Sequence, residues 1–387
     1  MSNIWQHPTT IAAEALRHLE DALVIAPMCA KDMTSEFTSK PNGWAKGDTV
    51  SFRTHGEYAV TEFSTTIVPQ DIKTSTRPMV IEKHFDISVE VTARELALDL
   101  DSFSEQVLKP ATYKLAESVD LYLGTKILQG AGLYVSTDLF ANAADIALAR
   151  KAAILQQLAM NRFCLVDLDT EAVLLGQTWF NQSQTRGNDG EITLRNADMG
   201  RVMGMDFFSS IAFPTNAVLF DAGTMVCAVN NGAGGNSNNR IGDTTLTVDT
   251  QTASKVVRAG DRLNIAGVRR PLLVKTLISD TTSTTSVALV DPITEIIPDN
   301  AAVTVIGSNV DLTFHGAIFD DRSLAIAFPM LDLPEDKSAG VSYNNGISIR
   351  VVKGYTQSTK KTTLSLDLLC GAFALDPRRI TVLADSQ

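Results

Sequence analysis

One block of this 387-residue chain contains strand patterns but no helix pattern, and it interrupts a region of mixed character. The block follows the turn-rich stretch NNGAGGNSNN at 230–239 and continues to about Gly307. Within it, short apolar runs such as TTLTVD, RLNIAG and AVTVIG alternate with turn residues, as in a small sandwich or barrel. Because mixed helix and strand patterns flank it on both sides, we expect residues 240–307 to form a small inserted β-barrel domain.

The first 34 residues contain one amphipathic helix, predicted from Thr10 to Ala26 and ended by Pro27. Its apolar stripe must be buried either in the chain's own core or on a neighbouring chain. Residues 35–78 are rich in Ser, Thr, Gly and Pro and offer little to fill a core. Long segments of this kind are usually functional or extended. We therefore predict a projecting two-stranded arm, with an ordinary surface meander as the alternative.

Long, regular elements follow the arm and return at the end of the chain. The run MVIEKHFDISVEV alternates apolar and polar residues, which is typical of a half-buried strand. Ser102 and Glu105 have the spacing of a capping box, and the helix that they open extends to about Leu128, roughly 40 Å. Residues 346–383 alternate in the same way around a polar turn, which predicts a long antiparallel hairpin. These elements together indicate an elongated, flat domain.

The middle of the chain mixes helices with buried strands. Residues 143–160 are predicted to be helical, RFCLVDL to be a buried strand, TEAVLLGQTWFNQS to be a second helix, and DFFSSIAFP to end in a strand. The mixed pattern resumes at Asn309 with LTFHGAIFDDRSLAIAFPML. The chain is therefore α+β, with the all-β block inserted in its α/β part.

Charge and cysteine content exclude some classes of protein. The chain has 33 Lys and Arg against 44 Asp and Glu, a formal charge of −11, which argues against a protein whose main task is to grip nucleic acid. The four cysteines are far apart and form no CxxC, so we expect reduced, mostly buried thiols. The start of the chain does not resemble a signal peptide, and no stretch is long and apolar enough for a membrane span.

A search for catalytic and binding motifs finds little. The GAGG at Gly232 lacks the spacing of a phosphate-binding loop, and the five histidines lack paired metal spacing. Asp320 and Asp321 could be a metal pair, but they are more simply explained as the cap of a helix over RSLAIAF. We predict no catalytic, cofactor-binding or metal-binding residues, although a triad can also assemble from distant residues.

Several segments resemble one known family in the same order along the chain. SFSEQVLKPATYKLAESVDLYL is similar to the spine-helix region of tailed-bacteriophage major capsid proteins. NADMGRVMGMDFFSSIAFP and FHGAIFDDRSLAIAFPML resemble the central domain of that family, and GISIRV with LDLLCGAFALDPRR resembles its closing strands. VRAGDRLNIAGV is similar to part of the β domain inserted in short-tailed phage coat proteins. These matches cover roughly two-thirds of the chain.

The resemblance implies the Hong Kong bacteriophage-type capsid fold. Its parts would be the N-terminal arm helix, 1–34, and the extended loop arm, 35–78. The peripheral domain with its spine helix would be 79–140, completed by 340–387. The apical domain would be 141–239, continued by 308–339, and would carry the inserted β-barrel, 240–307.

The same resemblance implies a shell protein of the virion capsid, assembled in the host cytoplasm. Its partners would be other copies of itself in pentamers and hexamers, a separate scaffolding protein, a portal protein, and packaged double-stranded DNA bound without sequence specificity. No cofactor, no membrane and no enzymatic activity are expected. The residues that we expect at assembly interfaces are Leu16, Leu19, Leu23, Val50 and Phe52.

Two alternatives remain open from the sequence. An encapsulin-like compartment shell would share the fold but hold enzymes instead of a genome; the inserted β domain and the long arm favour the phage interpretation. A phage-derived β-rich enzyme or carbohydrate-binding protein would need clustered carboxylates or aromatic residues. Aromatic residues are only 6% of the chain and show no cluster, which disfavours this second class.

Overall fold

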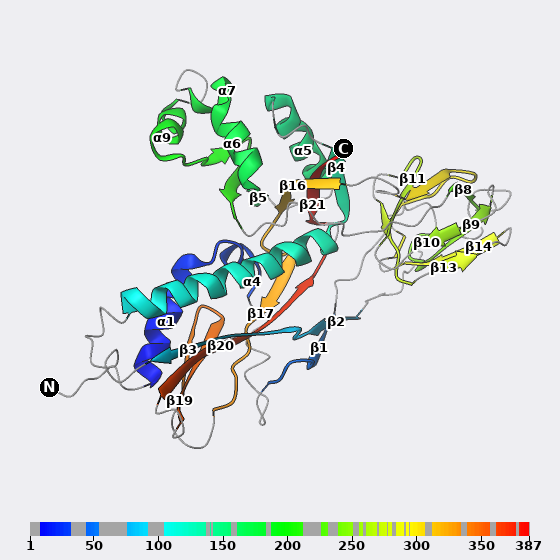
Figure 1. The fold of residues 1–387 in the computed structure, drawn as a ribbon. Coiled ribbons are helices and arrows are strands. Elements are labelled where there is room, and N and C mark those ends of the chain that lie inside the picture. Colours follow the sequence, from blue (N-terminus) through cyan, green and yellow to red (C-terminus); the bar gives the residue numbers. More distant parts are fainter. Residues whose placement is uncertain are drawn as a thin grey trace, which may run out of the picture.

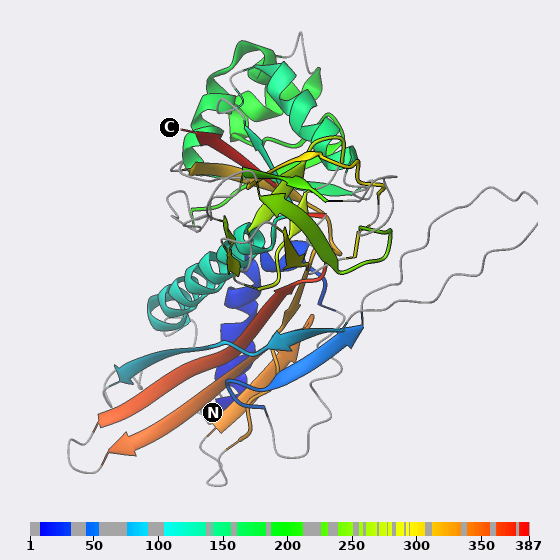
Figure 2. The same ribbon diagram turned by 90° about the vertical axis from the view of Figure 1, so that its right-hand side faces the viewer.

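The chain folds into three parts that we call the plate, the head and the β-block (Figures 1 and 2). The structure is a computed structural model that describes residues 8–31, 44–53, 76–91, 104–136, 140, 142–155, 161–182, 187–211, 226–230, 239–250, 255–257, 261–268, 271–276, 278–280, 284–289, 292–293, 295–305, 312–333, 339–356, 361–376 and 379–386. The plate contains both long helices, the head contains the shorter ones, and the β-block lies to one side.

The plate is built on the predicted closing hairpin, which the structure contains. β19 (Ile347–Thr356) pairs antiparallel with β20 (Lys361–Ala374). β18 (Ala339–Asn344) extends the sheet beyond β19, while β3 (Lys83–Val91) and β17 (Leu324–Ala327) pair with successive parts of β20. The fourteen residues of β20 therefore hold the whole sheet together.

Two helices cover one face of this sheet. α1 (Pro8–Ala22) packs on β18 and β19, and α4 (Lys109–Gly130) packs on β3, β20 and α1. α4 continues from a π-helical turn, η4 (Ser104–Leu108), and Pro110 lies at its start, where a missing backbone N–H disturbs the normal hydrogen-bond register. The predicted long helix is thus present, with a different first turn. A large core of Leu, Ile, Val and Ala side chains fills the space between helices and sheet.

Tyr122 fixes α4 on the sheet. Its hydroxyl accepts a hydrogen bond from the backbone N–H of Ala372 at 3.3 Å and donates one to Glu82 Oε2 at 3.3 Å. Lys126, one turn further along α4, donates to Glu82 Oε1 at 2.8 Å. Burial is the main reason why the pKa of Tyr122 is raised. The helix is therefore held at a defined position along β3 and β20.

The head is a six-stranded sheet with helices on one face. The strand order is β4-β21-β16-β5-β7-β6. The strands are β4 (Leu133–Ser136), β5 (Arg162–Val166), β6 (Arg201–Val202), β7 (Met205–Ser209), β16 (Leu312–Phe319) and β21 (Thr381–Ser386). The helices are α5 (Ala143–Leu155), α6 (Leu168–Gly176), α7 (Thr178–Asn181) and α9 (Asn188–Asn196). The predicted second helix of this region is thus two helices, which meet at Gln177.

The opposite face of the head sheet joins the core of the plate. Cys164 and Val166 of β5 face the head helices, whereas Leu165 between them belongs to the same core as α1 and α4. This alternation along β5 gives the head sheet a core of its own beneath the head helices and lets the core of the plate extend over its other face.

The β-block has a core of its own. Six strands are ordered β12-β11-β15-β8-β9-β14, with β10 and β13 as a separate pair. The strands are β8 (Val226–Val229), β9 (Thr245–Thr250), β10 (Lys255–Val257), β11 (Arg262–Ile265), β12 (Leu272–Leu273), β13 (Ile278–Asp280), β14 (Thr284–Ala288) and β15 (Ala302–Val305). A bridge between Val274 and Leu289 joins the two outer strands, so the sheet curls toward closure. Arg262 Nη2 donates to Gln129 O at the end of α4 over 3.3 Å, which links the block to the plate.

Four strands lie in other parts than the sequence predicted. β8 belongs to the β-block although we placed 226–229 in the apical domain, because it pairs with both β9 and β15. β17 belongs to the plate because it pairs with β20. β4 and β21 pair with each other, and β21 also pairs with β16, so both belong to the head. Each is a short strand whose partner is distant in sequence, and pairing decides its place.

The base of the predicted arm is a two-stranded antiparallel sheet. β1 (Thr49–Arg53) pairs with β2 (Thr76–Val80), and residues 54–75 of the predicted arm lie outside the described residues. Met79 and Ile81 pack with Leu369 and Ala327 on the face of the plate sheet opposite α4. The arm base is therefore anchored on the plate by apolar contacts.

Candidate assembly interface

The apolar stripe of α1 is buried inside the chain itself. Leu16, Leu19 and Leu23 are 3%, 0% and 5% exposed and belong to the core between helices and sheet. The sequence allowed this stripe to be buried either in the chain's own core or on a neighbouring chain. In the structure it lies in the chain's own core. A contact between these leucines and a neighbouring subunit remains a prediction, and in this conformation their side chains do not face solvent.

Val50 and Phe52, the other predicted interface residues, lie in β1. Their register partners in β2 are Met79 and Arg77. The strand pairing therefore places both residues in the base of the arm, next to the contact between the arm and the plate. Their role between subunits stays a prediction.

Two polar contacts hold α1 and the residues that follow it against the α4 region. Near the end of the helix, the buried carboxylate of Asp120 accepts hydrogen bonds from backbone N–H groups of Val24 and Ile25. Near its middle, His18 Nε2 lies 2.8 Å from Ser104 Oγ, and Ser104 Oγ donates to Glu14 Oε1 at 3.1 Å. Both contacts are between groups about 90 residues apart in sequence, so they define how α1 sits on α4.

The Ser104, His18 and Glu14 group has the composition of a catalytic triad but not its geometry. In a triad the acid binds the histidine nitrogen that faces away from the serine. Here Glu14 Oε1 lies 3.4 Å from the same Nε2 that contacts Ser104. The Ser104 proton is directed to Glu14, and Ser104 is only 4% exposed. The arrangement suits a structural contact rather than nucleophilic catalysis.

Asp320 is part of a buried ion pair, and the predicted helix after it is absent. Residues 324–327 form strand β17 instead, because this apolar run pairs with β20. The carboxylate of Asp320 pairs with Arg379 and accepts a hydrogen bond of 2.6 Å from Ser323 Oγ. Asp321 is exposed. In the part of the chain that the structure describes, no group of three or more His, Cys, Asp or Glu could hold a metal ion.

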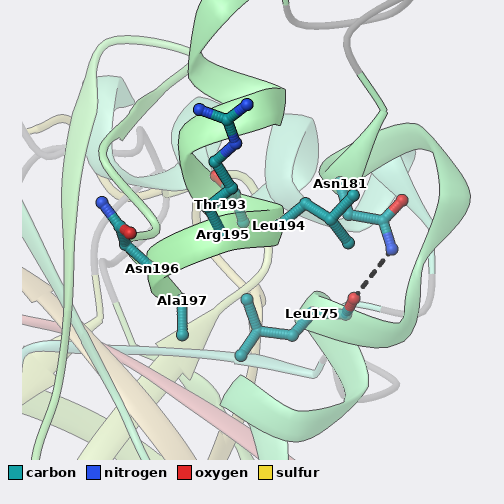
Figure 3. Close-up of a pocket in the computed structure, with 7 residues that line it drawn as sticks. All are labelled: Leu175, Asn181, Thr193, Leu194, Arg195, Asn196 and Ala197. Atoms are coloured by element: carbon teal, nitrogen blue, oxygen red, sulfur yellow. Dashed lines mark hydrogen bonds between the residues drawn. The ribbon is translucent and has the colours of Figure 1, made fainter.

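A shallow pocket lies on the head between the ends of α6, α7 and α9 (Figure 3). Its volume is about 390 Å³, and it is lined by Leu175, Asn181, Thr193, Leu194, Arg195, Asn196 and Ala197. Figure 3 shows Leu194 directed toward Asn181, whose amide donates to Leu175 O at 3.0 Å, while Arg195 extends away. Among the described residues, this lining offers no carboxylate, histidine or thiol for general acid–base chemistry.

Three of the four cysteines fit the sequence prediction, and the side chain of Cys227 lies outside the described residues. Cys29, Cys164 and Cys370 are free and buried, and burial raises the pKa of each. Such thiols are poor nucleophiles because the thiolate is the reactive form. Separately, none of the helices in the described ranges has both the length and the apolar character that a membrane crossing requires.

The sequence did not reveal the exposed apolar residues of the head. Leu148, Leu194 and Ile211 are 54%, 71% and 76% exposed. A signal was available for Leu148, because the helix pattern of residues 143–155 is apolar on more than one side. These surfaces are the strongest candidates for contacts with another molecule.

Comparison with solved structures identifies the fold. A chain from Mycobacterium phage Che8 superposes with a TM-score of 0.51 and 11% identity, covering 93% of this chain and 90% of that one. The capsid of cyanophage P-SCSP1u gives a TM-score of 0.46 with 12% identity over 89% and 85% of the two chains. A virus-like particle from Pyrococcus furiosus gives 0.42 with 8% identity over 99% and 100%.

Other similar structures include the mature capsid of bacteriophage PhiM1 and the capsid of an empty GTA particle. The resemblance to tailed-phage major capsid proteins is therefore confirmed at the level of the fold. No protein-family model matches the chain, and no curated protein sequence matches it.

Proposed function

We propose that this chain is a major capsid protein that self-assembles into the icosahedral shell enclosing a phage genome. The observation that carries the proposal is the fold shared with the Mycobacterium phage Che8 chain, which extends over 93% of this chain. A likeness that covers 93% of this chain and 90% of that one extends over most of the fold rather than over one common motif. The ordered sequence resemblance to phage coat proteins supports the same proposal independently.

In this proposal each part of the fold has a place in the shell. α4 is the spine helix, and the plate sheet with α1 is the peripheral domain in the shell wall. The head is the apical domain, and the β-block is its inserted β-barrel. β1 and β2 form the base of the extended loop that reaches a neighbouring subunit. A flat subunit with projecting parts suits a shell because stable assembly needs large complementary edges.

The proposed partners follow from this role. Copies of the chain contact one another in pentamers and hexamers, with a separate scaffolding protein and a portal protein during assembly in the host cytoplasm. The net charge of −11 suits a wall that packaged double-stranded DNA contacts without tight binding, because each bound phosphate requires a cationic group. We assign the chain no enzymatic role in this proposal.

Electron microscopy of the purified protein, expressed with a scaffolding protein, tests the proposal. We expect closed shells of uniform diameter that elute in the void volume of a size-exclusion column. Monomers or dimers alone under these conditions would overturn it. Shells purified from infected cells should contain double-stranded DNA; a cargo enzyme in place of DNA would instead identify a compartment shell.

A further inference from the structure

The chain passes three times between the described elements of the plate and those of the head. Residues 131–132 lead from α4 to β4, and residues 320–323 lead from β16 to β17. The third connection leads from β20 to β21 and includes residues 375–376 and 379–380. Figure 1 shows α4 and β20 both running from the plate toward the head sheet. We call the three connections together the joint.

Backbone hydrogen bonds join the connections to one another. The N–H of Leu375 donates to Ser323 O at 2.9 Å, which links the second connection to the third. The N–H of Gly132 donates to Ile380 O at 3.0 Å, which links the first connection to the third. The joint is therefore one hydrogen-bonded unit, although its parts are far apart in sequence.

A buried ion pair crosses the joint. Asp320 is 0% exposed, and its carboxylate pairs with Arg379, whose side chain is 28% exposed. Asp320 directly follows β16, and Arg379 lies two residues before β21. The two charges thus belong to different connections. Because a buried carboxylate that loses its cation is strongly unfavourable, this pair resists separation.

Ser323 ties the ion pair to the backbone of both connections. Its hydroxyl oxygen accepts a hydrogen bond from the N–H of Asp320 at 2.9 Å. Its one proton has two acceptors within reach, Asp320 Oδ1 at 2.6 Å and Arg379 O at 2.9 Å. Ser323 is 0% exposed, and hydrogen bonds in such a buried site are strong. We call Asp320, Ser323 and Arg379 the joint cluster.

Apolar packing also joins the head to the plate. Leu165, Phe314 and Val382 of the head sheet belong to the same core as α1 and α4. An apolar contact can repack and lose its unique arrangement before it loses stability. A hydrogen-bonded ion pair, in contrast, requires a defined distance and direction. The joint cluster is therefore better suited than the apolar contact to fix the angle between the head and the plate.

We propose that the joint cluster is a latch that locks the orientation of the head on the plate, so that the head turns only when the pair of Asp320 and Arg379 opens. While the pair is closed, the three connections move as one rigid body. Opening leaves two charges without partners in a buried site, which disfavours intermediate angles and makes the movement a switch between discrete positions. This inference concerns the isolated chain and does not depend on the proposed shell function.

The distance between a label on the head and a label on the plate tests the latch. Leu194 in α9 is 71% exposed and Tyr355 in β19 is 62% exposed, so Leu194→Cys with Tyr355→Cys provides two accessible sites for spin labels. Pulsed electron spin resonance of the unassembled chain gives the distribution of distances between the labels. We expect a narrow distribution with the native joint cluster, and one about twofold broader or more after Asp320→Asn or Arg379→Gln. An unchanged distribution in these variants would overturn the latch. The chain without the introduced cysteines measures any labelling of the native thiols.

A second buried ion pair provides the matched control. In the plate, Arg350 pairs with Asp367, whose side chain is 6% exposed. This pair joins β19 to β20 and does not cross the joint. Asp367→Asn should therefore lower the urea midpoint, as Asp320→Asn should, but leave the distribution of distances narrow. Equal broadening by both variants would indicate a general loss of packing and would overturn the latch.

A double variant separates the latch from the effect of a single unpaired charge. Asp320→Asn with Arg379→Met removes both charges and keeps a side-chain oxygen that accepts from Ser323, so no buried charge is left without a partner. If the ion pair fixes the angle, the distribution stays broad in this variant. A return to the narrow distribution would show that the apolar contact alone orients the head, and the proposal would be wrong.

Hydrogen exchange of the wild-type chain gives a test that does not require any variant to fold. The amides of Leu375 and Gly132 donate across the joint, whereas Leu366 lies within β20, between β3 and β19. If the joint is locked, the first two amides exchange as slowly as that of Leu366, through unfolding of the whole chain. Exchange at Leu375 and Gly132 that is faster by about tenfold or more would show that the joint opens locally, and would overturn the latch.

Discussion

One carboxylate oxygen of Asp120 accepts a hydrogen bond of 2.9 Å from the backbone N–H of Val24, and the other oxygen accepts one of 3.2 Å from Ile25. The residue is 3% exposed, and burial raises its pKa to about 6, although the backbone hydrogen bonds oppose this shift. The chain after α1 therefore turns around a buried acid that belongs to α4.

The first prediction concerns the pH dependence of this contact. Because the folded-state pKa of Asp120 lies above its unfolded value, its stabilising contribution is fully present below about pH 4 and is lost as the pH rises through about 6. The shift corresponds to about 3 kcal/mol. The Asp120→Asn variant has no titrating group at this position. When the pH is lowered from 7 to 4, the free energy of unfolding of the wild type should therefore rise by up to about 3 kcal/mol relative to that of the variant. Urea unfolding at both pH values measures the difference; an equal difference at both would contradict the assignment.

The second prediction concerns the buried stripe of α1. Leu19 is 0% exposed, so Leu19→Ala should lower the free energy of unfolding by about 2–5 kcal/mol through lost apolar contact and a cavity. Arg17 on the same helix has a side chain that is 64% exposed, and Arg17→Ala should change stability by less than about 1 kcal/mol. Urea unfolding of the two monomers checks the contrast.

The burial of α1 also changes an expectation from the sequence. If the stripe packed on a neighbouring chain, as the predicted assembly role of Leu16 and Leu19 requires, aspartates at these two positions would leave the monomer folded. Since both side chains are in the core, this double variant should instead fail to fold. Circular dichroism of a folded double variant would show that α1 is not needed in the core.

The third prediction concerns Gly316 in β16. A Cβ at this position would lie 2.5 Å from Leu165 O of the neighbouring strand, and the register of β16 with β21 shifts between Phe314 and Gly316. Gly316→Ala should therefore cost about 1–3 kcal/mol, because the strands must move apart. The control is Gly354→Ala in β19, where a Cβ would meet nothing within 4 Å. Equal urea midpoints for the two variants would contradict the close approach.

The sequence predicted those elements whose pattern is local and long. The hairpin of β19 and β20 has an uninterrupted alternation, and Ile347, Ile349 and Val351 are buried as expected. Its polar face is less open to solvent than the pattern indicates. Ser348 is 3% exposed because its hydroxyl donates to the carbonyls of Phe328 and Pro329. Alternation identifies the two faces of a strand but does not show that another segment of the chain covers the polar face.

Short apolar strands could not be assigned to a part of the fold. VCAV in β8, LAIA in β17 and the strand from Thr381 to Ser386 in β21 are each compatible with any sheet. Only pairing with distant strands places them in the β-block, plate and head. The candidate contact surfaces were missed for a related reason: the exposure of Leu194 depends on how α7 and α9 pack, which no local pattern records.

The last prediction concerns the extent of the β-block as an independent folding unit. β8 lies inside its sheet, between β15 and β9, and not at an edge. Its residues Cys227 and Ala228 pair with Val303 and Ala302 on one side and with Thr250 and Asp249 on the other. Removing a central strand leaves two unpaired edges and opens the core at Val229, which is 0% exposed.

A fragment of residues 226–307 should therefore fold alone, whereas a fragment of residues 240–307 should not. The longer fragment also keeps Asn230 and Asn239. The Asn239 amide donates to Asn230 O at 3.0 Å and to Thr247 O at 3.1 Å, and its oxygen accepts from Thr247 N at 2.7 Å. We expect dispersed amide signals in the NMR spectrum of the longer fragment and a modest melting temperature, because so small a core is only marginally stable. The shorter fragment should give a random-coil spectrum. If both fragments gave the same dispersed spectrum, β8 would be dispensable and the block would begin after Asn239, as its composition alone indicates.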